Sequence, residues 1–321
     1  MQTRQIYTFG TYLQNRFGER VFKVPVSISG FTCPNIDGTV AKGGCTFCEN
    51  DSFSPSLDRA KPLKGFHLNL DSPENPYLER QLKQLQIQFE SLSARLRRDY
   101  GAKKFLVYFQ SFTNTYAPFE TLKALYDRAL SFDDVVGLSI GTRSDSVTEE
   151  TLDYLAELSG DKEIWIEFGI QSVYDETLER INRGHDSANV REWILKAKER
   201  GLNVCGHLIF GLPGESREMM LETAKQAYAW GIDSVKYHPL YVVKRTALYN
   251  EYMRGEFEPI SEEEYIEVLA EAIRMKPEQV SVQRMTAGID DASLVAPEWC
   301  RDKNRQIRHI NAALKKVGLK Y

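Results

Sequence analysis

Three of the chain's five cysteines lie within sixteen residues, in the segment FTCPNIDGTVAKGGCTFCEN at positions 31–50. Cys33, Cys45 and Cys48 have the residue type and the close spacing of metal ligands, because thiolates bind zinc and iron–sulfur clusters. A closed site of either kind normally takes four protein ligands, so this segment is one ligand short. The first question that the sequence raises is what fills the fourth position.

Three kinds of site are compatible with the cysteines alone. A zinc site would need a distant fourth ligand, and the residues that could supply it are His185, His207, His238, Cys205 and Cys300. A redox pair of Cys45 and Cys48 is less favoured, because Cys33 would have no role and the preceding glycines do not indicate a thiol-activating helix terminus. A cluster held by three thiolates would leave one iron open to a small molecule, and the cysteines alone do not separate it from zinc.

Length and composition narrow the class of protein. A chain of 321 residues is long enough for about two domains or one large α/β barrel. No apolar run approaches the roughly 20 residues of a membrane helix, and the first residues lack the apolar segment of a secretory signal. Clustered cysteines in a reducing compartment favour metal binding over disulfides. We therefore expect a cytoplasmic protein without a membrane anchor.

Strand-like and helix-like runs alternate along the chain from about residue 103, as in consecutive βα units. The expected strands are KVPVSIS before the cysteines, KFLVYFQ (104–110), VVGLSIG (135–141), EIWIEFG (163–169), NVCGHLIFG (203–211) and DSVKYHPL (233–240). Six such repeats predict an α/β fold, a partial (βα)6 TIM-type barrel over residues 1–245. Residues 246–321 break the repeat and predict a C-terminal α/β extension that ends in a basic helix. Residues 51–76, with four prolines, predict a loop.

The polar residues of interest each follow one of these strands. In a parallel barrel the functional face lies at the carboxyl ends of the strands. The cysteines follow the first strand, and the segments after the next five are QSFTNTY, TRSD, GIQS, GLPGES and HPLYVVK. We expect all six segments to meet at one opening.

Taken in order, these segments resemble a family. The chain is similar to radical S-adenosylmethionine (SAM) enzymes, in the YhcC/YtqA-like branch related to the radical SAM domain of the Elongator catalytic subunit. The resemblance covers nearly the whole chain and rests on GFTCPNIDGTVAKGGCTFC, YFQSFTNTYAP, VGLSIGTRSD, EFGIQSVYDETLERINRGHD, HLIFGLPGE and KYHPLYVVK. The eleven residues between the first two cysteines depart from the commonest family spacing but resemble that of this branch.

The resemblance implies a set of cofactor-binding residues. Cys33, Cys45 and Cys48 would bind three irons of a [4Fe–4S] cluster, and SAM would chelate the fourth iron. The residues that would contact SAM are Gln110, Ser111, Thr113, Thr142, Arg143, Glu167, Gln171, Arg183 and His207. Arg183 would pair with the SAM carboxylate, because a guanidinium binds a carboxylate through two hydrogen bonds.

Some of these residues have simpler interpretations. Gln110 could be an ordinary strand-end amide, Arg183 an exposed helix-end cation, and His207 a core histidine. A buried Glu167 needs a partner, so a structural ion pair competes with a role at the cofactor. For Asp145, we expect the role of N-cap of the following helix.

Substrate contacts are expected after the sixth strand, at Lys236, His238 and Lys244, because SAM would occupy the earlier strands. The resemblance implies reductive cleavage of SAM to a 5′-deoxyadenosyl radical, an electron donor of the flavodoxin or ferredoxin type, and tRNA as substrate at a wobble-uridine side chain. Residues 301–321 carry seven basic residues against one acidic residue, a local charge of +6 that suits phosphate contact. The sequence leaves open two alternatives, which are radical chemistry on a small molecule or peptide and a zinc-stabilised binding protein.

Overall fold

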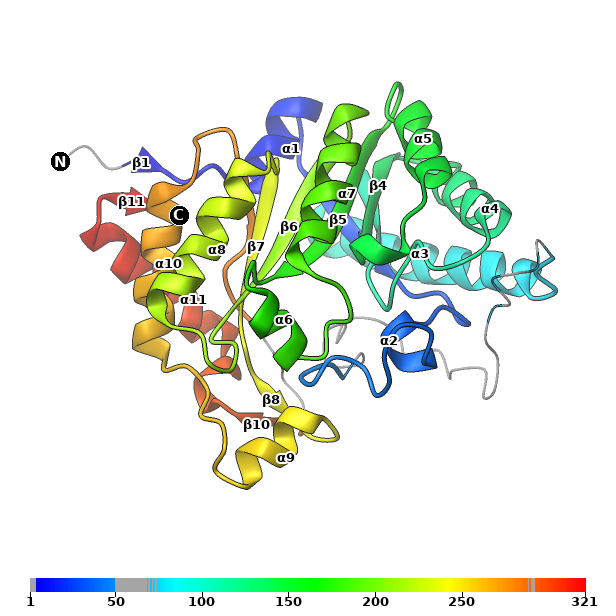
Figure 1. Ribbon diagram of the computed structural model, residues 1–321. Helices are drawn as coiled ribbons and strands as arrows, with labels where there is room; N and C mark the ends of the chain where they lie inside the picture. Colours follow the sequence, from blue (N-terminus) through cyan, green and yellow to red (C-terminus); the bar gives the residue numbers. More distant parts are fainter. Residues whose placement is uncertain are drawn as a thin grey trace.

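A sheet of seven parallel strands forms the centre of the protein, in a computed structural model that describes residues 4–49, 68, 70, 72, 74–287, 289 and 292–321 (Figure 1). The strand order is β2-β3-β4-β5-β6-β7-β9, which follows the chain. The strands are β2 (Val21–Val26), β3 (Lys104–Phe109), β4 (Val135–Thr142), β5 (Glu163–Gln171), β6 (Asn203–Phe210), β7 (Ser234–Pro239) and β9 (Ser281–Arg284). In the described residues β2 and β9 are not paired with each other, so the sheet is a half-barrel rather than a closed one. This confirms the predicted partial barrel and all six predicted strands.

Helices follow the strands and cover the outside of the sheet (Figure 1). Besides α11, described below, the long ones are α3 (Leu78–Tyr100), α4 (Phe119–Leu130), α5 (Glu149–Leu158), α7 (Ser187–Glu199), α8 (Arg217–Ala229) and α10 (Glu262–Met275). Four of them begin at a side chain that accepts a hydrogen bond from the first turn, namely Thr148, Asp186, Ser216 and Ser261.

The expectation that Asp145 caps α5 is wrong. Thr148 lies next to the first helical residue and takes that role, while Asp145 lies in a short 3₁₀ turn, η2 (Ser144–Ser146).

The strands are buried on both faces, as apolar runs in a parallel sheet require. The first eight of the nine residues of β5 are buried, and so are the last five of β3. Gly137 in β4 shows how closely the strands pack, because a Cβ atom there would lie 1.9 Å from the carbonyl oxygen of Glu163.

One end of the barrel is closed by α1 (Phe9–Phe17), which lies at the opposite end of the strands from α2 (Pro34–Asp37) (Figure 1). Phe9 and Leu13 pack on Trp165, Leu106 and Cys205, and the rings of Phe9 and Trp165 meet edge to face with centroids 4.9 Å apart. Burial raises the pKa of Cys205 to about 12, so its thiol remains protonated in this apolar plug. The interior of the barrel is thereby left accessible from the carboxyl ends of the strands.

The chain after residue 245 adds further elements. These are α9 (Ala247–Met253), β9, β10 (Leu294–Ala296), η3 (Glu298–Cys300), α11 (Lys303–Lys316) and β11 (Leu319–Lys320). β10 pairs antiparallel with β8 (Val242–Val243), and β11 pairs parallel with β1 (Arg4–Gln5). The division of the chain into domains at residues 1–245 and 246–321 stays a prediction. Most of the predicted loop at 51–76 lies outside the described residues.

Candidate active site

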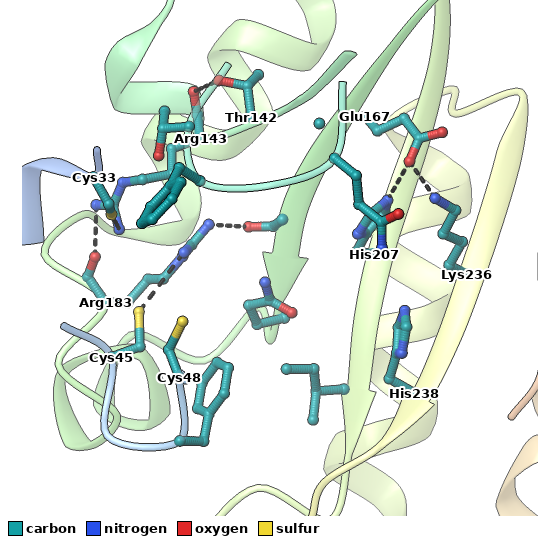
Figure 2. A pocket seen from close by; sticks show the side chains of 18 of the residues that line it. Cys33, Cys45, Cys48, Thr142, Arg143, Glu167, Arg183, His207, Lys236 and His238 are labelled. Atoms are coloured by element: carbon teal, nitrogen blue, oxygen red, sulfur yellow. Dashed lines mark hydrogen bonds and ion pairs between the residues drawn. The ribbon is translucent and has the colours of Figure 1, made fainter. Parts of the chain in front are cut away.

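A cavity opens at the carboxyl ends of the strands, where the sequence predicts the functional face. Cys33, Cys45 and Cys48 line one side of it. Glu167, His207, Lys236 and His238 line the other side, and Figure 2 shows the two groups facing each other across the cavity.

The three cysteines lie on the loop that follows β2. Cys33 is the N-cap of α2, which begins at Pro34, a residue suited to the first helical position. The loop then turns through three glycines with positive φ, Gly38, Gly43 and Gly44, before it reaches Cys45. The sequence alone marked these three cysteines, and the structure brings all of them to one cavity.

A second loop, between α6 (Asp175–Arg180) and α7, holds the cysteine loop in place. The buried Asn35 amide nitrogen donates to the carbonyl oxygens of Asn182 at 2.6 Å and Arg183 at 2.9 Å. In return, the Asn182 side chain donates to the carbonyl oxygen of Gly44 at 2.7 Å. Gly184 is essential to this contact, because its φ is +81° and a Cβ atom would lie 2.6 Å from Asn35 Oδ1. The sequence reasoning did not identify Asn35, although its position two residues after Cys33 was available as a signal.

Three nitrogen donors face the sulfur atoms. Arg143 Nη1 lies 3.9 Å from Cys33 Sγ, Arg183 Nη1 lies 3.8 Å from Cys45 Sγ, and Asn35 Nδ2 lies 3.6 Å from Cys45 Sγ. Donors and positive charges at this distance stabilise thiolates and the negative charge of a metal cluster.

The donor set fits an iron–sulfur cluster better than a single metal ion. All three thiols are free and line one cavity, and burial, followed by the neighbouring Cys45 and Cys33, raises the pKa of Cys48. Among the described residues, only three His, Cys, Asp or Glu side chains have ligand atoms that all lie within 4.8 Å of one another. These are Glu167, Cys205 and His207. The sulfur atoms of the three cysteines are therefore spread more widely than the roughly 3.8 Å that a tetrahedral zinc with 2.3 Å bonds imposes.

Most residues predicted to contact SAM line the same cavity. They are Gln110, Thr113, Thr142, Arg143, Glu167, Gln171, Arg183 and His207, whereas Ser111 is buried beside them without lining it. Two buried polar atoms among them have no hydrogen-bond partner, Gln171 Oε1 and Arg183 Nε. Unpaired buried polar atoms are costly, so both are suited to a polar ligand in this cavity. Arg183 is buried, which excludes the interpretation as an exposed helix-end cation.

Arg143 fixes the loop after β4. Its guanidinium pairs with Asp145 through two hydrogen bonds, at 2.8 and 2.6 Å, and also donates to the carbonyl oxygen of Arg183 at 2.7 Å. Burial alone would raise the pKa of Asp145, yet the hydrogen bonds from Arg143 lower it. Asp145 is therefore the ion-pair partner of an arginine that faces the cysteines.

Glu167 lies at the floor of the cavity in a network of ion pairs. Its fully buried carboxylate accepts from Lys23 Nζ at 2.7 Å, from His207 Nε2 at 2.7 Å, from Ser139 Oγ at 2.5 Å and from Lys236 Nζ. Burial alone would raise the pKa of Glu167, yet the two lysines hold it well below its usual value. Glu167 therefore forms structural ion pairs and also borders the cavity, and its predicted role at the cofactor stays a prediction.

The predicted substrate residues separate in the structure. Lys236 and His238 line the cavity, whereas Lys244 is exposed and lies outside its lining. Two further lining residues, Tyr108 and Arg284, were missed by the sequence reasoning, as was Lys23 behind Glu167. Each of these is a polar residue within a strand, a pattern that by itself indicates only a side chain facing a barrel interior.

Fold and cavity together define a parallel α/β half-barrel with a three-cysteine site at its carboxyl face. Residues 38–227 match the family model of the radical SAM superfamily, and residues 232–316 match the Radical_SAM C-terminal domain. The chain belongs to the radical SAM superfamily. It is therefore a radical SAM enzyme, a family whose members use SAM and a [4Fe–4S] cluster.

Individual proteins agree with this assignment. YtqA of Bacillus subtilis is 35% identical over 315 residues, which are 98% of this chain and 91% of YtqA. The tRNA uridine(34) acetyltransferase of Methanocaldococcus infernus is 34% identical over 163 residues, which are 50% of this chain and 30% of that enzyme. The solved structure of the archaeal Methanocaldococcus infernus Elp3 superposes with a TM-score of 0.61 at 22% identity, over 94% of this chain and 65% of that one. The branch predicted from the motifs is thus confirmed.

No helix in the described part of the chain is both long enough and apolar enough to cross a membrane.

Proposed function

We propose that Cys33, Cys45 and Cys48 hold a [4Fe–4S] cluster whose fourth iron binds SAM. The observation that carries this proposal is the convergence of three free thiols and two buried arginines, Arg143 and Arg183, on one cavity. When bound, the cluster and SAM supply a 5′-deoxyadenosyl radical that abstracts hydrogen from the substrate.

The chain's own residues bind and orient SAM in this proposal. Arg183 has an unpaired Nε atom for the SAM carboxylate, and Gln171 has an unpaired Oε1 atom for an N–H or O–H donor of SAM. Residues 110–113 follow β3, and the backbone N–H of Thr113 donates to the carbonyl oxygen of Thr32, next to Cys33, at 3.2 Å. The loop therefore lies beside the cysteine loop, which supports the proposal that residues 110–113 contact the SAM amino group. Apolar residues of the lining, including Phe47 and Ile209, exclude water from a reactive radical.

Anaerobic reconstitution tests the cofactor proposal. Cys45→Ala should abolish both the brown colour of the cluster and the cleavage of SAM, because two thiolates would remain. Cys300→Ala is a matched control, since Cys300 is a fully buried free thiol outside the trio, and it should retain both. A wild-type protein that contains zinc but no iron after reconstitution would overturn the proposal.

For the substrate, we propose a wobble uridine of tRNA, modified at its C5 substituent. The support is the identity shared with the tRNA uridine(34) acetyltransferase, whose name states its target. The basic tail gives weaker support than its charge of +6 indicates, because α10 neutralises part of it. Arg305 and His309 both pair with Glu262, at 3.2 and 2.8 Å. In the described structure, Arg308, Lys315 and Lys316 form no ion pair and remain available for phosphates.

Nucleoside analysis tests the tRNA proposal. Digested tRNA from wild-type cells should contain a modified uridine that is missing or incomplete in cells without this gene, and a plasmid copy should restore it. A Cys45→Ala copy serves as the control and should not restore it. An unchanged nucleoside profile would remove tRNA as the substrate and leave small-molecule or peptide chemistry as the alternative. An electron donor of the flavodoxin or ferredoxin type and a cytoplasmic location belong to the same proposal.

A further inference from the structure

The inner end of the cavity carries more positive than negative charge. Lys236 and Arg284 line it, and Lys23 lies just behind them, whereas Glu167 is the one acidic residue among the described residues of the lining. With both histidines neutral, these four groups sum to +2. Figure 2 shows Glu167, His207, Lys236 and His238 together at this end, across the cavity from the cysteines.

The histidines do not change this balance at neutral pH. Burial and the charge of Lys236 lower the pKa of His207 to about 4, although Glu167 opposes this effect. Burial and the charge of Arg284 hold the pKa of His238 well below its usual value. Both rings are therefore neutral donors or acceptors at the edge of a cationic site.

The sheet places two of the cations side by side. Lys236 in β7 is the register partner of Arg284 in β9, and His207 in β6 is the register partner of Lys236. Register partners on neighbouring strands point to the same face, and all three side chains line the cavity. Two like charges in this arrangement repel each other, so the pair weakens the fold unless something negative lies between them.

Among the residues that the structure describes, Arg284 has no such partner. Glu167 bonds to Lys23 and Lys236, and Lys236 also donates to the Tyr108 hydroxyl at 3.0 Å. In the described part of the chain, no hydrogen bond or ion pair involves the Arg284 guanidinium, although its side chain is partly buried. A guanidinium offers five N–H donors in a fork that matches the two oxygens of a carboxylate or phosphate.

We propose that Arg284 and Lys236 bind a terminal oxyanion, a carboxylate or a phosphate, of the substrate. The inference rests on the proposed function, since it concerns what the radical SAM cavity holds beside SAM. The anion must be a terminal group, because the site lies at the floor of the cavity beside the buried Glu167. An internal phosphate of a nucleic acid is joined to further nucleotides on both sides, and the floor leaves no room for both. The acid is therefore carried by a small co-substrate or by the substituent of a nucleobase.

Anion binding to the cluster-loaded protein tests this site directly. Isothermal titration calorimetry would use malonate, inorganic phosphate and, as an uncharged control of matched shape, malonamide. Unreduced protein saturated with SAM is used, so that the arginine proposed to hold the SAM carboxylate is occupied. Wild-type protein should bind malonate or phosphate but not malonamide, and the anion that binds identifies the chemistry of the group.

Variants separate this role from a structural one. Arg284→Gln should weaken binding of the anion by about tenfold or more, because a charge-assisted bidentate contact is lost. The same substitution should leave the melting temperature of the anion-free protein unchanged or raise it by about 1–3 °C, because it removes repulsion from Lys236. A structural arginine would instead lower the melting temperature. Arg191→Gln, at an exposed position in α7 outside the cavity lining, is the matched control and should bind as wild type does.

Three results would overturn the proposal. These are equal heats for malonate, phosphate and malonamide, equal affinity in wild type and Arg284→Gln, or a lowered melting temperature in that variant. None of these measurements depends on SAM cleavage or on tRNA. An unchanged tRNA nucleoside profile with intact anion binding would overturn the tRNA proposal alone, whereas the converse result would overturn this one alone.

Discussion

The side-chain amide of Asn35 lies 2.9 Å from the backbone carbonyl oxygen of Arg183, and this hydrogen bond joins the cysteine loop to the segment that carries an arginine of the cavity. The same amide lies 3.6 Å from Cys45 Sγ. One buried side chain therefore fixes both the position of the loop and the environment of a proposed cluster ligand. We call the hydrogen bonds of the Asn35 amide the Asn35 clamp. The clamp links two segments that are 148 residues apart in the sequence.

Replacing Asn35 should therefore reduce retention of the cluster. Asn35→Ala removes two hydrogen bonds and leaves the partly buried Asn182 oxygen without this donor, whereas Arg143 still donates to the Arg183 oxygen, so we expect a cost of about 1–3 kcal/mol for the loop contact. We expect less iron per chain after anaerobic reconstitution and faster loss of absorbance at 400 nm in air. Asn304→Ala, at an exposed position in α11, is the control and should behave as wild type. Equal iron content in the two variants would contradict the proposed clamp.

Gly184→Ala should disturb the same contact by steric overlap. A Cβ atom at Gly184 would lie 2.6 Å from Asn35 Oδ1 and 2.7 Å from Val40 Cγ1. Gly201→Ala is a closely matched control, because Gly201 also has a positive φ, of +75°, but has no atom within 4 Å of the added Cβ. Both variants carry the backbone strain of about 1 kcal/mol, and the overlap affects Gly184→Ala alone. Iron content should fall in Gly184→Ala and stay unchanged in Gly201→Ala; similar values would argue against a role for the close contact.

The barrel was predictable from the sequence because its signals are local. Strands that are buried on both faces form continuous apolar runs, as in β5, and helices such as α4 place apolar residues three and four positions apart. The three cysteines were predictable for the same reason, since residue type and spacing within one loop mark a metal site. Asp145 shows the limit of local signals, because two nearby side chains could cap α5 and only the folded position of Arg143 decides between them.

The interior network could not be predicted, because it depends on contacts between distant strands. Lys23 and Glu167 lie 144 residues apart in sequence and meet only when the sheet curves. Arg284 becomes a neighbour of Lys236 through the register between β7 and β9, which no sequence pattern in either strand specifies. Lysine and arginine are usually solvated, so Lys23 and Arg284 were not predicted to lie in the barrel interior, whereas Lys236 was predicted from its place after the sixth strand.

Glu167→Gln should destabilise the protein strongly. The substitution leaves Lys23 and Lys236 in the barrel interior without a carboxylate, and removal of one partner from a buried ion pair costs about 3–5 kcal/mol. We expect a large fall in the denaturant midpoint of the cluster-loaded protein, measured anaerobically by circular dichroism. Glu157→Gln, at an exposed position in α5, is the control and should change the midpoint little. If Glu167→Gln were as stable as this control, the network would contribute nothing to the fold and its residues would be free to serve the substrate alone.

Glu215→Gln should make stability less dependent on pH. Burial raises the pKa of Glu215 from 4.5 to about 7, although hydrogen bonds from Ser172 and Thr177 oppose the shift. The folded state therefore binds a proton more tightly than the unfolded chain does, so this group favours folding most below pH 4.5 and loses its contribution as the pH rises to 7 and beyond. A glutamine keeps a neutral acceptor for Ser172 at every pH.

The free energy of unfolding of Glu215→Gln, relative to wild type, should rise by about 1–2 kcal/mol between roughly pH 5 and pH 8.5. Denaturant titrations of wild type, Glu215→Gln and the exposed-site control Glu157→Gln at both pH values measure this difference. A constant difference between Glu215→Gln and wild type would mean that Glu215 ionises in the fold as easily as in the unfolded chain.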